Sequence, residues 1–172
     1  MACGSRVGGS AGAAFAALLA LLPFSAAGTS GEYKPAGILI RPGIALADRH
    51  LGFGWSGREQ RRRPQYRWIT RLEADVWFDL QQAVDHELWV NAAPMYLDWQ
   101  RQVVGVYVNG RFVAEWTCPD DPGFHDYRCD LPAAHLRTGR NRVTLRLAYR
   151  HRIPGDARSF ALAVRRILIG PR

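Results

Sequence analysis

Two tryptophans on the polar side of alternating segments are the first groups in this chain suited to binding a ligand. Residues 72–80 and 86–92 alternate apolar with polar side chains, and Trp77 and Trp89 both fall in the polar series. If a hairpin places residue 77 opposite residue 89, the two rings form one platform, and indole faces stack on the C–H surfaces of sugars. If the two strands belong to different sheets, or if the rings cover a sheet face, no platform forms.

A second candidate site follows the second alternating segment. Residues 93–100 contain Tyr96, Asp98 and Trp99, two aromatic rings and a carboxylate at a strand end. Binding residues gather on such loops because a rigid sheet positions them. The alternative is a capping loop in which Trp99 plugs the open end of the core.

A third group combines opposite charges with aromatic rings. Glu59 and Arg67 lie near Trp55 and Trp68 in the sequence. A carboxylate and a guanidinium beside two indoles could clamp a hydroxyl or carboxylate group of a ligand through paired hydrogen bonds. The structural alternative is a buried ion pair that pins the segment between residues 55 and 67 to the sheet.

Catalytic constellations are absent from the sequence pattern. Nucleophilic catalysis needs a nucleophile beside a base, and acid–base hydrolysis needs two carboxylates in different environments. Ser56 is not in a nucleophile-elbow motif, and no phosphate-binding loop or dinucleotide fingerprint occurs. The histidines show no metal-binding or catalytic spacing: they are His50, His86, His125, His135 and His151. We expect a protein that is not an enzyme, with no catalytic residue and no cofactor.

The N-terminal residues predict export. A short start carrying Arg6 precedes an apolar run at residues 11–24, which ends in Ser25-Ala26-Ala27. This order is typical of a secretory signal peptide, and the run is too short to cross a membrane comfortably. We predict a signal peptide at residues 1–27, a flexible leader at 28–37 and one domain at 38–172. The location is then periplasmic, secreted or at the cell envelope, with no membrane span after cleavage; the alternative is an uncleaved anchor.

The cysteines agree with export. Cys3 would leave with the signal peptide, and the mature chain would keep Cys118 and Cys129. An isolated pair in an exported protein predicts one disulfide bond, which closes a turn-rich loop at residues 119–123. A metal site or a reactive thiol is the alternative, but the spacing does not match that of a zinc site.

The charge balance is basic. The formal net charge is +8, and arginine supplies nearly all of it, since Lys34 is the only lysine. Such a balance favours binding to polyanions. An exported protein meets little nucleic acid, so anionic glycans, lipid headgroups or an acidic protein are better partners. The alternative is a GC-rich genome that encodes arginine in place of lysine.

Period-2 alternation dominates residues 38–172 and predicts an all-β fold. Asn109-Gly110 between two apolar runs predicts a type I′ hairpin, with Tyr107 opposite Phe112 and Val106 opposite Val113. A change of phase at Arg165-Arg166 predicts a β-bulge, and residues 132–136 predict one helical turn. The expected inward sets are Leu72, Ala74, Val76, Phe78 and Leu80; Leu88, Val90 and Ala92; and Val143, Leu145, Leu147 and Tyr149. Short strands with regular turns are typical of an antiparallel β-sandwich or jelly roll.

Five segments carry a resemblance to a known group of domains. They are Gly52-Phe-Gly-Trp-Ser-Gly-x-Glu59, Tyr66-Arg-Trp68, Ala92-Ala-Pro94, Val106-Tyr-Val-Asn-Gly-Arg111 and Gly139-Arg-Asn-x-Val-Thr-Leu145. Together the chain resembles the galactose-binding-like jelly-roll domains of bacterial envelope proteins, over residues 48–169. Such domains occur alone or appended to membrane glycosyltransferases and glycan-active enzymes.

This resemblance implies a fold more than a ligand, because one jelly roll hosts lectins, adaptors and enzyme appendages. We expect an exported, non-catalytic module that recognises carbohydrate or a glycan-bearing envelope component. The alternative is a structural or adaptor subunit that docks on an envelope protein, such as a membrane glycosyltransferase, and binds no sugar. A hydrolase or lyase accessory domain is a third reading. Related sandwiches often hold a structural Ca²⁺, but no loop here is nominated for it.

Overall fold

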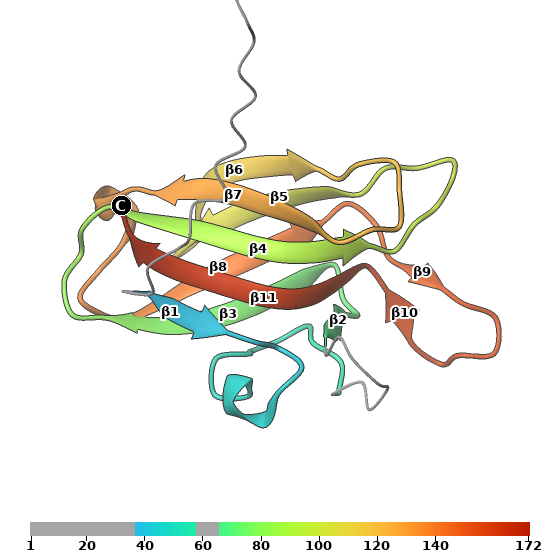
Figure 1. Cartoon of the computed structure of the whole chain (residues 1–172), viewed down its shortest axis with the longest axis horizontal. Coiled ribbons are helices and arrows are strands. Elements are labelled where there is room, and N and C mark those ends of the chain that lie inside the picture. The colour runs from blue at the N-terminus through green and yellow to red at the C-terminus, as the bar shows by residue number, and fades with distance from the viewer. Residues whose placement is uncertain (1–36, 58–65) are drawn as a thin grey trace, which may run out of the picture. The chain divides into compact units, whose positions relative to one another are not determined.

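The computed structural model describes residues 37–57 and 66–172, and this part of the chain is all-β (Figure 1). The predicted signal peptide, all but the last residue of the predicted leader, and Glu59 lie outside the described residues. No helix in the described ranges is long and apolar enough to cross a membrane. The elements are β1 (Ile38–Ile40), η1 (Ala45–Ala47), β2 (Arg67–Ile69), β3 (Glu73–Leu80), β4 (His86–Pro94), β5 (Val103–Val108), β6 (Arg111–Thr117), β7 (His125–Leu131), η2 (Ala133–His135), β8 (Gly139–Leu147), β9 (His151–Arg152), β10 (Ser159–Phe160) and β11 (Leu162–Pro171).

The strands form two main antiparallel sheets that share one core. The first has the order β1-β11-β4-β7, with β2 also paired to β11, and the second has the order β3-β8-β5-β6; β9 and β10 form a separate small ribbon. Side chains from both sheets meet in a single buried cluster. The predicted antiparallel β-sandwich is therefore confirmed.

The alternating pattern predicted the buried face of each long strand. Ala74, Val76 and Phe78 of β3 are each at most 1% exposed, and the inward sets of β4 and β8 are buried as well. Leu72 is the exception: it precedes β3 and is 48% exposed. Because successive side chains of a strand point to opposite faces, the polar series of the same strands lies on the outer faces.

The hairpin and the bulge are largely as predicted. Asn109 and Gly110 have φ values of 50° and 86°, as a type I′ turn requires. Tyr107 lies opposite Phe112, but Val106 lies opposite Ala114 rather than Val113, because one extra residue is inserted in β6. In β11, the register shifts between Val164 and Arg166, which confirms the predicted bulge.

The predicted Trp77–Trp89 platform is wrong. Trp77 lies on β3, which pairs with β8, whereas Trp89 lies on β4, which pairs with β11 and β7. The link between the two strands crosses from one sheet to the other, so the outward faces of β3 and β4 point to opposite sides of the sandwich. The alternative in which consecutive strands lie in different sheets is the correct one.

The predicted disulfide is not formed: Cys118 and Cys129 are both free thiols. Cys118 directly follows β6, whereas Cys129 lies on β7 in the other sheet, and the Trp116 ring bridges β6 and β7. Trp116 stacks on Tyr127, and its indole N–H donates a hydrogen bond of 3.0 Å to the carbonyl oxygen of Arg128, next to Cys129. Burial raises the pKa of Cys118 and raises the pKa of Cys129 to about 12.

We expect both thiols to be unreactive in the folded protein. Burial raises the pKa of both thiols, and the thiolate is the reactive form. Cys129, with a pKa of about 12, is at least roughly 1,000-fold less ionised at pH 8 than an ordinary cysteine. Iodoacetamide at pH 8 should leave Cys118 and Cys129 unmodified in native protein and label both in urea without a reductant. A crosslinked 118–129 peptide in a non-reducing digest would contradict this expectation and show that the disulfide does form.

Candidate binding site

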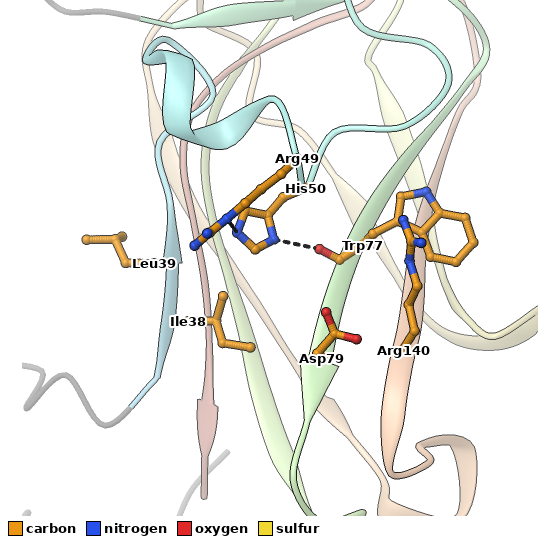
Figure 2. Close-up of a pocket in the computed structure, with 7 residues that line it drawn as sticks. All are labelled: Ile38, Leu39, Arg49, His50, Trp77, Asp79 and Arg140. Atoms are coloured by element: carbon orange, nitrogen blue, oxygen red, sulfur yellow. Dashed lines mark hydrogen bonds between the residues drawn. The ribbon is translucent and has the colours of Figure 1, made fainter.

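A hollow beside β3, lined in part by β1, is a candidate site, and Figure 2 shows its lining. Its volume is about 740 Å³. β1 contributes one wall, the segment after η1 another, and the ends of β3 and β8 the floor. We call it the Trp77 hollow; it is lined by Ile38, Leu39, Arg49, His50, Trp77, Asp79 and Arg140.

Positive charge exceeds negative charge in the Trp77 hollow. Among the described residues, neither Arg49 nor Arg140 has a carboxylate within ion-pair distance, and Asp79 is the single carboxylate of the lining. By contrast, Arg142, one row away on β8, faces Asp75 at 3.6 Å. The hollow therefore offers two guanidinium groups for an anionic or strongly hydrogen-bonding ligand.

The Trp77 ring is held at one side of the hollow. The guanidinium carbon of Arg140 lies over the ring, 4.6 Å from its centre. The Nε1 edge of the ring lies against Gly52, where a Cβ atom would come within 2.7 Å of Nε1. Only glycine permits this close approach, which explains why Gly52 begins the Gly-Phe-Gly-Trp segment.

His50 attaches the loop after η1 to β3. Its Nδ1 lies 2.9 Å from the carbonyl oxygen of Trp77, and its Nε2 lies 3.0 Å from Nε of Arg49 (Figure 2). A carbonyl only accepts, so Nδ1 carries the proton and Nε2 accepts from Arg49. This pattern describes a neutral imidazole, so His50 adds no charge and instead orients Arg49.

A pair of asparagines positions the start of β8, from which Arg140 projects. Asn141 is fully buried. Its Oδ1 accepts hydrogen bonds from Nδ2 of Asn109 at 2.8 Å and from the backbone N–H of Arg137 at 2.9 Å. Its Nδ2 donates to the carbonyl oxygens of Arg137 and Gly139. These are the asparagines of the two most common segments of the resemblance, and their role is structural.

The second predicted group lies elsewhere in the fold. Trp99 is 72% exposed and contacts His151 of β9 edge to face, and Tyr96 and Asp98 are also exposed. The hydroxyl of Tyr149 donates to the carbonyl oxygens of Met95 and Gln100, which fixes the loop. Trp99 therefore does not plug the core, and the structure does not bring this loop into the Trp77 hollow.

The third predicted group is a structural anchor in the described residues. Arg67 is buried, and its Nη2 donates to Asp48 at 2.6 Å. Trp55 donates from Nε1 to the carbonyl oxygen of Asp75, and Trp68 packs on Phe160 with ring centres 5.1 Å apart. This ion pair attaches the segment after η1 to β2. The predicted pairing with Glu59 lies outside the described residues and stays a prediction.

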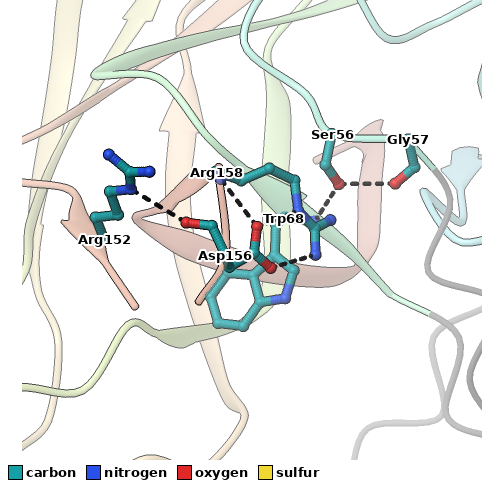
Figure 3. A network of polar contacts seen from close by, with 6 residues as sticks. All are labelled: Ser56, Gly57, Trp68, Arg152, Asp156 and Arg158. Carbon is teal, nitrogen blue, oxygen red and sulfur yellow. Dashed lines mark hydrogen bonds and ion pairs between the residues drawn. The ribbon is translucent and has the colours of Figure 1, made fainter. Parts of the chain in front are cut away.

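Figure 3 shows the polar contacts around Trp68. Ser56 donates from Oγ to the carbonyl oxygen of Gly57 and accepts from the backbone N–H of Trp68. In the β9–β10 turn, Arg158 pairs with Asp156 at 3.0 Å. The hydrogen bond from the Arg158 side chain lowers the pKa of Asp156. These contacts fix turns and leave no open acid–base pair.

Trp89, the remaining predicted residue, lies on the outer face of the five-stranded sheet. The guanidinium carbon of Arg128 lies 3.2 Å from its ring centre. A guanidinium lies over this ring as over Trp77, but of the two rings it is Trp77 that borders the hollow. The alternative in which a ring covers a sheet face therefore describes Trp89.

Sequence reasoning missed Arg49, His50, Asp79 and Arg140 as site residues. Asp79 could have been predicted, since it belongs to the same outward series as Trp77. Arg140 lies opposite Asp79 in the β3–β8 register, but no sequence pattern fixes which strands are neighbours in a sheet. Within residues 37–57 and 66–172, no three His, Cys, Asp or Glu side chains cluster closely enough to hold a metal ion.

Comparisons with known proteins show similarity at the level of the fold. No protein-family model matches the chain, and no curated protein matches it in sequence. A family 35 carbohydrate-binding module from Clostridium thermocellum superposes with a TM-score of 0.51 at 14% identity, over 77% of this chain and 98% of that chain. A ruminal GH26 endo-beta-1,4-mannanase has a TM-score of 0.51 at 14% identity, over 82% of this chain. The chain spans only 27% of that mannanase. These superpositions confirm the predicted β-sandwich as a fold.

Replacing Asn141 with alanine should destabilise the protein strongly. The change leaves two part-buried carbonyl groups and two part-buried N–H donors without their Asn141 partner, and each unsatisfied buried group costs about 1–3 kcal/mol. Allowing for water entry, we expect a loss of about 2–4 kcal/mol in urea denaturation followed by tryptophan fluorescence. Thr138→Ala, an exposed change in the same loop, should shift stability by less than about 0.5 kcal/mol. Equal stabilities for the two variants would disprove this role for Asn141.

Proposed function

We propose that this protein is an exported, non-catalytic module that binds carbohydrate in the Trp77 hollow. One observation carries the proposal: an open hollow joins an indole ring, one carboxylate and two guanidinium groups that have no carboxylate partner in residues 37–57 and 66–172. An apolar sugar face packs on the indole, hydroxyl groups donate to Asp79, and acidic groups accept from the arginines. A few placed polar groups around an apolar surface are typical of small-ligand sites.

The charge of the hollow favours an acidic saccharide. Arg49 and Arg140 line the hollow together with Asp79, and the hydrogen bonds of His50 describe a neutral ring. The guanidinium carbon of Arg140 lies over the Trp77 ring. A planar guanidinium held in this way binds a carboxylate or sulfate through two parallel hydrogen bonds.

The same lining supports binding without hydrolysis. Most glycoside hydrolases use two carboxylic acids on either side of the bond that breaks. Of the residues that line the hollow, Asp79 alone carries a carboxyl group. The superposition on nearly the whole of a carbohydrate-binding module also supports a binding role. Export rests on the N-terminal sequence, which predicts delivery to the periplasm, the envelope or the medium.

Binding can be tested by calorimetry with polygalacturonate, methyl-esterified polygalacturonate and β-1,4-mannan. Trp77→Ala should weaken binding of the best ligand by roughly 10- to 100-fold, or about 1.4–2.8 kcal/mol. Arg140→Gln should weaken binding of polygalacturonate more than binding of its ester, and added salt should do the same.

Trp99→Ala is the matched control, since it removes an exposed indole outside the hollow. Loss of binding in Trp99→Ala with normal binding in Trp77→Ala would move the site to the 93–100 loop. No binding to any of the three glycans, together with a defined complex with an envelope protein in a pull-down, would replace this proposal with the adaptor function.

A further inference from the structure

The sheet that carries Trp77 also presents an exposed aromatic patch. Phe112 of β6 is 55% exposed, and its ring meets the ring of Tyr107 edge to face, with centres 5.5 Å apart. We call these two residues the Phe112 patch. The Tyr107 ring leans over Gly105, where a Cβ atom would lie 3.2 Å from Cε2. Arg146 stacks on Tyr107 at 4.2 Å.

The strand register places the Phe112 patch on the same face as the Trp77 hollow. Trp77 lies opposite Arg142, and Thr144, two residues along β8, lies opposite Tyr107. All four side chains belong to the outward series. Two strand spacings and one two-residue step separate Trp77 from Tyr107, which places their Cα atoms about 12 Å apart. This spacing exceeds the length of one sugar unit, so only a chain of several units reaches both aromatic groups.

The surface between the two aromatic groups is polar and nearly neutral. Thr144 donates from its hydroxyl to Asp75 at 2.6 Å, and Asp75 also faces Arg142 at 3.6 Å. Arg146 pairs with Glu73 at 2.8 Å. The acidic partners of Arg142 and Arg146 lie on β3, so the charges of these two arginines are largely compensated at the surface.

We propose that the outer face of the β3-β8-β5-β6 sheet is one extended site for a linear polysaccharide. An acidic unit binds in the Trp77 hollow, the chain crosses β8 over Thr144, and an uncharged unit packs on the Phe112 patch. This inference rests on the proposed carbohydrate binding and extends it to a chain of several units. The ligand class is a linear polysaccharide in which acidic and uncharged units are neighbours.

The test uses hyaluronan oligosaccharides, in which an acidic unit alternates with an uncharged one, of two, four and six units. Calorimetry on the intact protein should show affinity rising at least fivefold from disaccharide to hexasaccharide. Phe112→Ala should weaken hexasaccharide binding roughly tenfold, because one ring loses its apolar contact. It should leave disaccharide binding unchanged. Phe112→Tyr keeps the ring and should restore the length dependence, and Trp99→Ala should alter neither.

The outcomes separate the two proposals. Equal affinity at all lengths, with binding still lost in Trp77→Ala, would overturn the extended site and leave the carbohydrate site intact. If Phe112→Ala weakens binding equally at every oligosaccharide length, the extended site is also overturned. The patch would then affect the hollow rather than bind a distant sugar unit. No binding at any length, for these oligosaccharides and for the three glycans above, would overturn both proposals.

Discussion

The hydrogen bond between Asn109 and Asn141 joins the two turns on which the four-stranded sheet depends. Asn109 has a positive φ and forms the tip of the β5–β6 hairpin. Its side chain donates to Asn141, and its Oδ1 accepts from the backbone N–H of Arg142. An amide side chain both donates and accepts, so neither a carboxylate nor an apolar residue of the same size satisfies this buried set. Through this contact, the hairpin fixes the start of β8. The start of β8 in turn positions Arg140 beside Trp77.

Arginine has a structural role on this surface that lysine would fill poorly. In the part of the chain that the structure describes, five aromatic rings carry a guanidinium: those of Trp77, Trp89, Tyr107, Phe124 and Phe160. Such contacts occur about once in 70–80 residues in general, so they are enriched here. A planar guanidinium stacks on a ring and keeps its N–H groups free at the edge, which an ammonium group cannot do. The arginine content is therefore partly explained by packing, beyond any bias of genome composition.

Local alternation predicted most of the fold and only part of the site. Period 2 fixes which face of a strand a residue occupies, so the inward positions, the Asn109-Gly110 turn and the β11 bulge were predictable. It does not fix which sheet a strand joins, so Trp77 and Trp89 looked equivalent although they lie on opposite faces. The partner of Arg67 was missed for the same reason: Asp48 comes from a loop that is brought to β2 by tertiary packing. The predicted disulfide was wrong because proximity in sequence does not show that a ring such as Trp116 bridges two strands.

The distribution of ion pairs separates the hollow from the rest of its sheet. Arg142 and Arg146 each have an acidic partner on β3, so their charges are largely cancelled at the surface. Arg49 and Arg140 have none among the described residues, and Arg49 donates to a histidine that the hydrogen bonds describe as neutral. Exposed charges more than about 8–10 Å apart are screened at physiological salt, so this excess acts locally. An anionic group is therefore attracted to the hollow more than to the neighbouring strip, and the neutral strip lets an uncharged unit cross the sheet without an unpaired charge beneath it.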